Sequence, residues 1–186
     1  MGAALVCLLL GGCQSRSLSV LSMPALPLLA PASLGMSVQA TQVIVSQSRR
    51  HEASEPLQST VVLHVTEAQI TLVNLTATGQ RLYTLTYDGQ VVQHSAAFSQ
   101  VQIPGGHILG LMQLALWPTS TLQAAYHDDW RFDAQAGVRK AYYQGKLMVE
   151  IQSTAQLPSA WPATSHIDDY ASGMALDVTT LEYQRL

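Results

Sequence analysis

The chain has 186 residues, of which 48% are hydrophobic and only 11% are charged, and its formal net charge is −3. This balance excludes a nucleic-acid-binding protein that relies on a basic patch, and the length suits one domain with a sizeable core. Because the charged share is far below the usual quarter, the surface must rely on Gln, Ser and Thr or be partly apolar.

The chain begins with a short apolar run that ends in small residues and a cysteine. The run is about ten residues long, whereas a membrane span requires roughly 20. It closes on Leu10-Gly11-Gly12-Cys13, and polar residues follow at once. This ending resembles a lipobox, the cleavage and lipidation signal of bacterial lipoproteins. The resemblance implies a signal peptide at residues 1–12 and acyl chains on Cys13.

Cys7 and Cys13 are the two cysteines of the sequence. If Cys7 is removed with the signal and Cys13 becomes a thioether, the mature domain has no thiol for a disulfide, a metal site or a nucleophile. A Cys7–Cys13 disulfide or two structural thiols are the alternatives. The lipobox reading, with Gln14 rather than Asp after the cysteine, implies the outer membrane, on its periplasmic face, as the destination.

Residues 13–35 are predicted to form a proline-rich tether to a domain at residues 36–186. Pro24, Pro27 and Pro31 disfavour a regular helix and favour an extended or polyproline conformation. Leu26, Leu28, Leu29 and Leu34 indicate that the second half of the segment packs on the domain, since a pure Gly/Ser linker contains no leucine.

Alternating apolar residues then predict five antiparallel strands. They are expected at residues 37–49, 59–66, 69–76, 81–87 and 91–98. The turns between them, including Asp88-Gly89, are too short for crossover helices, which indicates a meander. In the third strand the apolar face shifts after Leu72 to Val73, which predicts a bulge.

A helical pattern interrupts the strands. Residues 107–117 are apolar nearly all round, which predicts a buried helix that ends at Trp117-Pro118. Thr119 or Ser120 is expected to cap a second short helix that ends near Tyr126.

The last part of the chain returns to strands. They are expected at residues 130–134, 138–144, 146–153 and 173–183, with a loop at 157–164. We therefore predict a mainly β fold with a helical insertion. Roughly seven strands would form an open antiparallel half-barrel wrapped on the central apolar helix.

The sequence offers no platform for enzyme chemistry or for a cofactor. It has no Gly-x-Ser-x-Gly elbow and no phosphate-loop or dinucleotide motif. His127-Asp128-Asp129 and His166-Ile167-Asp168-Asp169 could together supply ligands to a divalent metal. Because neither spacing matches a known ligand motif, we interpret both as polar loops at the ends of elements, and we predict no metal site.

Two pairs of adjacent basic residues have two interpretations. Arg49-Arg50 and Arg139-Lys140 could contact anionic lipid headgroups, or they are solvated turn charges, which we favour. His64 and His94 lie within strand patterns and are interpreted as paired core residues or surface residues.

The helix at residues 108–116 is the remaining functional candidate. One interpretation is a plain core helix. The other is that it fills or gates the inside of the curved sheet, where a hydrophobic ligand would bind. The candidate cavity residues are Ile108, Leu111, Met112, Leu114, Ala115, Leu116, Trp117, Tyr83 and Leu85.

Three motifs carry a family resemblance across most of the mature chain. They are Thr78-Gly79-Gln80-Arg81-Leu82 with Leu85, Tyr87, Asp88 and Gly89, then Leu111-Met112-Gln113-Leu114-Ala115-Leu116-Trp117-Pro118, and last Met174-Ala175-Leu176-Asp177-Val178. With the lipobox and the tether, they are similar to an uncharacterised family of bacterial outer-membrane lipoproteins, a domain of unknown function in the LolA/LolB-like superfamily.

The resemblance implies an open antiparallel β-barrel that is closed by helices and holds an apolar cavity. Superfamily members carry or receive the acyl chains of lipoproteins in the periplasm, and related lipoproteins occur alongside aryl-polyene lipid synthesis. It carries over no catalytic residues. Two functions follow as hypotheses: binding or transfer of a lipid or acylated molecule, or a structural role in which a sheet edge binds a protein partner at the outer membrane.

Overall fold

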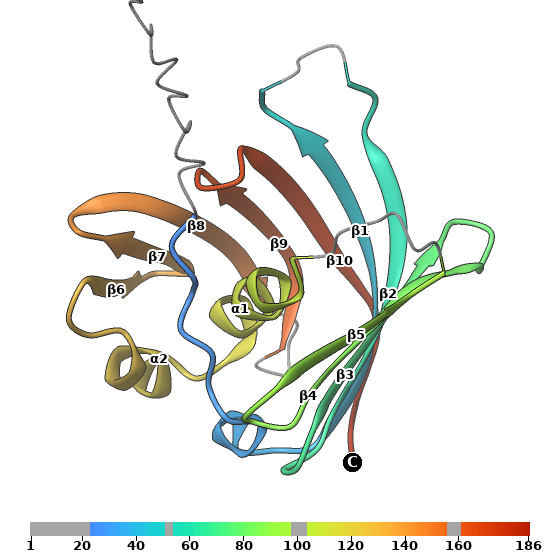
Figure 1. Cartoon of the computed structure of the whole chain (residues 1–186), viewed down its shortest axis with the longest axis horizontal. Coiled ribbons are helices and arrows are strands. Elements are labelled where there is room, and N and C mark those ends of the chain that lie inside the picture. Colours follow the sequence, from blue (N-terminus) through green and yellow to red (C-terminus); the bar gives the residue numbers. More distant parts are fainter. Residues whose placement is uncertain (1–22, 51–53, 98–103, 156–160) are drawn as a thin grey trace, which may run out of the picture.

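A computed structural model of the chain describes residues 23–50, 54–97, 104–155 and 161–186 (Figure 1). The lipobox with Cys7 and Cys13 lies outside the described residues. In the part that the structure describes, a single sheet of ten antiparallel strands curves around a helix. The sheet is open, because strands β5 and β6 form its two edges.

Each half of the sheet is a meander of five strands. The first half contains β1 (Val38–Ser48), β2 (Leu57–Val65), β3 (Ile70–Thr76), β4 (Arg81–Tyr87) and β5 (Val92–Ala96). The second contains β6 (Trp130–Gln135), β7 (Val138–Tyr143), β8 (Lys146–Ala155), β9 (Pro162–Asp169) and β10 (Met174–Arg185). The spatial order is β5-β4-β3-β2-β1-β10-β9-β8-β7-β6. The first and last strands therefore pair in the middle and join the two meanders.

Two α-helices connect the meanders, α1 (Gly105–Leu116) and α2 (Thr119–Ala125). Helix α1 lies in the hollow of the curved sheet (Figure 1). Residues 23–34, which we call the strap, lead past α1 into the short 3-10 helix η1 (Pro31–Leu34). The strap buries Leu26, Leu29 and Leu34 in the core, which confirms that the second half of the proline-rich segment packs on the domain.

The predicted fold class is confirmed by this architecture. The fold is mainly β with a helical insertion, and an open antiparallel half-barrel wraps a central apolar helix. Alternate residues of the central strands face α1, so that Val61, Leu63 and Val65 of β2 are buried between exposed or half-buried neighbours. The alternation of apolar and polar residues along these strands therefore predicts correctly which side chains face the inside of the sheet.

The prediction for residues 162–169 is wrong. A loop followed by polar residues at the end of an element was expected there, whereas these residues form strand β9. The strand buries Ser165, Ile167 and Asp169 in alternation. Only one of these three side chains is a large apolar group, so the usual hydrophobic pattern is absent. Pairing on both sides, with β8 and β10, holds the strand in place.

The irregularity predicted in β3 is present but lies further along the strand. The inner face of β3 continues from Leu72 to Asn74 and does not switch at Val73, and the register shift against β4 falls between Asn74 and Leu75. The predicted cap of α2 is wrong. Helix α2 has Pro118 at its N-cap and no side-chain cap hydrogen bond. Pro118 fixes the backbone at this point, so neither Thr119 nor Ser120 acts as the cap.

Candidate ligand cavity

A cavity of about 230 Å³ lies between α1 and the inner face of the sheet. Strands β1 to β4, β9 and β10 supply one wall. Helix α1 supplies the other through side chains at positions three and four apart, which share one helix face. These are Ile108, Leu111, Met112, Ala115 and Leu116.

Six of the nine candidate cavity residues line this space, namely the five on α1 and Tyr83 on β4. Leu85, Leu114 and Trp117 are fully buried but lie outside the lining. A helix that is apolar all round does not reveal which of its faces meets a cavity and which meets packed protein. For this reason the prediction from the sequence includes Leu114 and Trp117 among the cavity residues.

The opposite face of α1 meets the strap. A Cβ atom at Gly110 would lie 2.6 Å from the Cβ of Leu26, so only glycine permits this approach. One turn further along the helix, Gln113 forms two hydrogen bonds with the main chain of Leu29. Trp117 Nε1 then donates to Ser33 Oγ at 2.8 Å. The contacts advance along both segments together, so the strap follows the helix over two turns.

Arg139 of β7 caps the C-terminal end of α1. Its Nη1 donates to the carbonyl oxygens of Leu114, Ala115 and Trp117, each at 2.9 Å. Carbonyls at a helix C-terminus lack intrahelical partners and carry partial negative charge, which a cation offsets. Burial lowers the pKa of the Arg139 guanidinium, which stays charged at neutral pH. The solvated turn charge favoured for Arg139 is therefore wrong.

The other basic residues of the two adjacent pairs also contact protein groups. Lys140 Nζ lies 3.1 Å from a carboxylate oxygen of Glu150. Arg49 pairs with Asp168, and Arg50 Nη2 donates to the carbonyl of Ala171 at 3.1 Å. The side chains of His64 and His94 are exposed.

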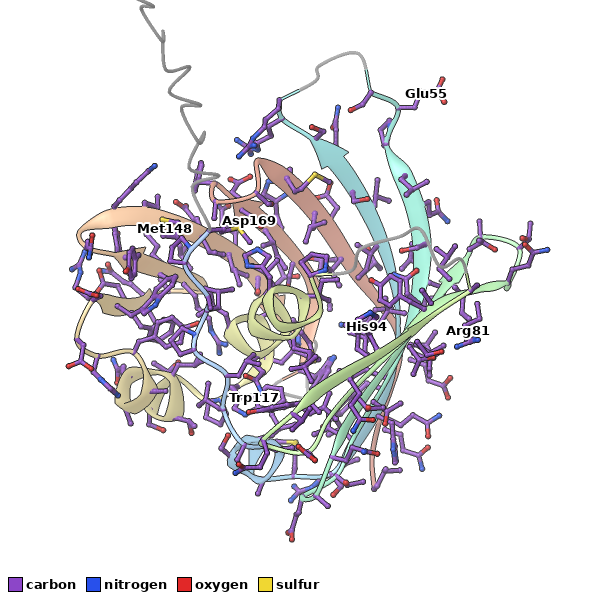
Figure 2. The ribbon with its side chains drawn as sticks, viewed as in Figure 1. Glu55, Arg81, His94, Trp117, Met148 and Asp169 are labelled. Carbon is purple, nitrogen blue, oxygen red and sulfur yellow. The ribbon has the colours of Figure 1, made fainter. Side chains whose placement is uncertain are left out.

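A buried hydrogen bond between His107 and Asp169 fixes the N-terminal end of α1. His107 Nε2 lies 2.6 Å from Asp169 Oδ2, and the Ser172 hydroxyl donates to the same carboxylate. Burial acts to raise the pKa of Asp169, but the hydrogen bonds from His107 and Ser172 outweigh it and hold that pKa below its usual value. Figure 2 labels Asp169, which contacts His107 near the start of α1, and Trp117, which follows the end of the helix.

These three residues do not form a catalytic triad. In a Ser-His-Asp triad the histidine lies between the hydroxyl and the carboxylate and takes the proton from the serine. Here the carboxylate of Asp169 lies between Ser172 and His107. None of the three lines the cavity. Their arrangement fastens α1 to the β9–β10 turn, a contact that the sequence analysis missed because it joins residues 62 positions apart.

The two acidic–histidine clusters lie in separate surface hollows, one lined by His127 and the other by His166. His127 pairs with its neighbour Asp128. His166 Nδ1 lies 2.6 Å from Asp177 Oδ1, and this hydrogen bond raises the pKa of His166. Within the described residues, no group of three or more His, Cys, Asp or Glu side chains is placed to hold a metal ion.

Residues 37–182 match the model of a family described as protein of unknown function (DUF3261). The chain belongs to the DUF3261 family. No curated protein matches it. Across the described ranges, no helix of this DUF3261 protein combines the length and apolar character needed to cross a bilayer.

Solved structures with low sequence identity resemble the DUF3261 chain. An outer membrane lipoprotein-sorting protein domain from Vibrio parahaemolyticus shares 9% identity at a TM-score of 0.42, with 81% of this chain and 85% of that chain covered. A DUF1329 family protein from Desulfovibrio piger has the same TM-score and coverages at 7% identity. The MucA/MucB complex structure from Pseudomonas aeruginosa gives 15% identity, a TM-score of 0.40 and coverages of 84% and 54%, so the DUF3261 chain spans about half of that chain.

Proposed function

We propose that this protein is an outer-membrane lipoprotein, anchored through a lipidated Cys13 on the periplasmic face, that binds or transfers a lipid or acylated molecule. Its role would be in lipoprotein or aryl-polyene lipid export. The observation that carries the binding function is the cavity of about 230 Å³ between α1 and the sheet. Small-molecule sites are concave and mostly apolar with a few polar groups, and the lining of this space has that character, which supports a binding role.

The size and lining of the cavity suit part of one acyl chain. An apolar cavity of about 150 Å³ binds benzene, and small-ligand pockets begin at roughly 300 Å³. Met112 is half-buried at the lining, and its unbranched side chain adopts other rotamers easily. Movement of this side chain would lengthen the space for a longer chain.

The contacts around α1 favour such side-chain movement over displacement of the whole helix. Arg139 holds one end of the helix, His107 joins the other end to Asp169, and Gln113 binds the strap on the far face. A ligand would therefore enter beside the cavity face of α1 while the helix stays in place.

The chemistry of the lining favours binding at this site. Among the described lining residues there is no His, Cys, Lys, Arg, Asp or Glu. Ser165 Oγ lies 2.8 Å from Ser153 Oγ, so the hydrogen-bond partner of this hydroxyl is a second hydroxyl and not a base. A serine nucleophile requires an adjacent general base, which these side chains do not supply.

Detergent-free purification followed by lipid extraction and mass spectrometry tests the binding function. We expect copurified acyl lipid with the native protein and a loss of it in Ala115→Phe, which fills the cavity. Ser120→Phe, on the exposed side of α2, is the matched control and should retain lipid. A ligand-free protein that also fails to bind fatty-acyl probes would contradict the proposal and favour the structural role with a protein partner.

A separate experiment tests the anchor. Metabolic labelling with radioactive palmitate should mark the native protein and not Cys13→Ser, and cell fractionation should move that variant from the outer membrane to the soluble periplasm. An unlabelled native protein would overturn lipidation at Cys13 and leave the cavity function to be judged by the first experiment.

A further inference from the structure

The inner face of β1 to β4 changes from apolar to polar along the strands. Residues that pair across these strands form rows that face α1. Two apolar rows are Val38-Val65-Ile70-Tyr87 and Ala40-Leu63-Leu72-Leu85, and the next row is Gln42-Val61-Asn74-Tyr83. Unlike the first two rows, the third row contains amide side chains, Gln42 and Asn74, and all four of its residues line the cavity.

Asn74 is the centre of the polar row. Its Nδ2 donates to Ser59 Oγ at 3.3 Å and to Tyr83 Oη at 3.2 Å. Its Oδ1 is buried and has no hydrogen-bond partner among the described residues, although the side chain is only 7% exposed. A buried acceptor without a donor costs free energy that a hydrogen bond would recover. Asn74 also lines the cavity, so a ligand donor that reached this acceptor would recover that cost.

The exposure of the lining shows how a ligand would lie. Leu63 and Leu72, in the apolar rows, are almost fully buried, whereas Ser46 and Tyr83 are half-buried. The lining thus becomes more accessible toward the β1–β2 and β3–β4 turns, on the side where Figure 2 marks Glu55 and Arg81. An apolar tail would point toward Leu63 and Leu72, and a polar head would reach Asn74.

The lining also selects the charge of that head. No charged side chain is present among the described lining residues, and an ion that leaves water without a counter-charge pays a large desolvation cost. Burial raises the pKa of Tyr83, so its hydroxyl stays neutral at physiological pH. A carboxylate or phosphate head would find no cation in this cavity.

On the basis of the proposed function, we infer that the cavity selects an acyl molecule with an uncharged head that donates one hydrogen bond to Asn74 Oδ1. Two lipid classes present this chemistry, an amide N–H beside an acyl chain and the hydroxyl of a neutral glycerolipid. Their shared feature is a neutral donor at the end of an apolar chain.

Binding of four C12 probes to the purified protein tests this inference by displacement of a fluorescent fatty-acyl reporter. The probes are lauramide, 1-monolaurin, methyl laurate and laurate. Lauramide and monolaurin separate the amide and hydroxyl sources. We expect the better of these two to bind roughly tenfold more tightly than methyl laurate, which has no donor, and laurate at neutral pH to bind more weakly than methyl laurate.

Asn74→Leu should remove the preference for the donor while methyl laurate still binds. Thr71→Val, which changes the outer face of the same strand, is the control and should keep the preference. The comparison among probes uses the native protein, so it stands even if Asn74→Leu fails to fold. Equal binding of all four probes would overturn the inference and leave the proposed function intact, as would tighter binding of the donor-free ester. Binding of none would overturn both.

Discussion

The carboxamide of Gln113 pairs with both main-chain polar groups of Leu29. Its Oε1 accepts from the Leu29 N–H at 2.9 Å, and its Nε2 donates to the Leu29 carbonyl at 2.7 Å. Gln113 is fully buried on α1. The strap therefore docks on the helix in the way that one β-strand pairs with another, with a side chain in place of a second backbone.

Gln113→Leu should destabilise the domain by about 2 kcal/mol or more, because it leaves the N–H and carbonyl of Leu29 buried without partners. Urea unfolding measures this loss, and hydrogen exchange at the Leu29 amide should accelerate. Gln123→Leu, at an exposed position of α2, should change stability by less than about 0.5 kcal/mol. Unchanged exchange at Leu29 in Gln113→Leu would contradict the docking role.

Two glycines of α1 should respond to alanine in opposite directions. A Cβ at Gly110 would meet Leu26 at 2.6 Å, so Gly110→Ala should cost about 1–3 kcal/mol through overpacking. At Gly106 the nearest atom would be Leu28 Cδ1 at 4.0 Å, so Gly106→Ala should gain about 0.5 kcal/mol from the greater helix propensity of alanine. Thermal unfolding of the two variants side by side checks the sign of each change.

Arg139→Met should destabilise the protein by about 3 kcal/mol, since the three carbonyls at the end of α1 lose a charged donor. Arg131→Met is the matched control, because Arg131 is 61% exposed and its ion pair with Asp133 is solvated. It should lose less than about 1 kcal/mol. Equal losses in the two variants would show that Arg139 acts as an ordinary surface charge.

The stability of the domain should fall in acid because of Asp169. Its folded pKa lies below the ordinary value of 3.8, so the unfolded chain binds more protons as the pH falls through this range. The contribution is complete above that ordinary value and is lost as the pH drops through the folded pKa. Melting temperatures between neutral pH and about pH 2.5 should show a shallower acid dependence in Asp169→Asn than in the native protein or in Asp129→Asn.

His166 should make the stability of the domain fall as the pH rises, the opposite of the dependence expected from Asp169. The hydrogen bond to Asp177 raises its folded pKa above the ordinary 6.5, so its contribution is complete below pH 6.5 and is lost as the pH rises through the folded value. The side chain is 41% exposed, so the effect should stay below about 1 kcal/mol and shrink with added salt. An NMR titration of the His166 ring, native against Asp177→Asn, checks the direction.

The parts of the fold that follow local periodicity could be predicted from the sequence. Leu63 and Val65 alternate with polar residues, and α1 combines helical spacing with a proline stop at Pro118. Strand β9 could not be predicted in this way, because Ser165 and Asp169 occupy inward-facing positions where apolar residues are usual. Pairing on both sides overrides that weak pattern.

The helical wall of the candidate site was predictable from the sequence, whereas Tyr83 was the one predicted lining residue on the sheet wall. The spacing of Ile108 and Met112 marks one helix face, but the partners of the opposite face lie 84 residues away at Leu29 and Ser33. Asn74 had one signal in the sequence, a polar residue in the inward series that contains Ile70 and Leu72. The change of pattern there predicts a bulge, and a register shift does follow Asn74, but the pattern does not show that Asn74 itself lines the cavity.

The docking of the strap also limits how far the domain can move from a lipid on Cys13. Ten residue steps separate Cys13 from Met23, where the described strap begins, and ten steps span at most about 35 Å. A domain of this size is itself roughly 40 Å across. Pro24 and Ala25 line the same surface hollow as Trp130 and Tyr143, so this corner would be held closest to the bilayer. A lipid on Cys13 would thus orient the domain as well as retain it.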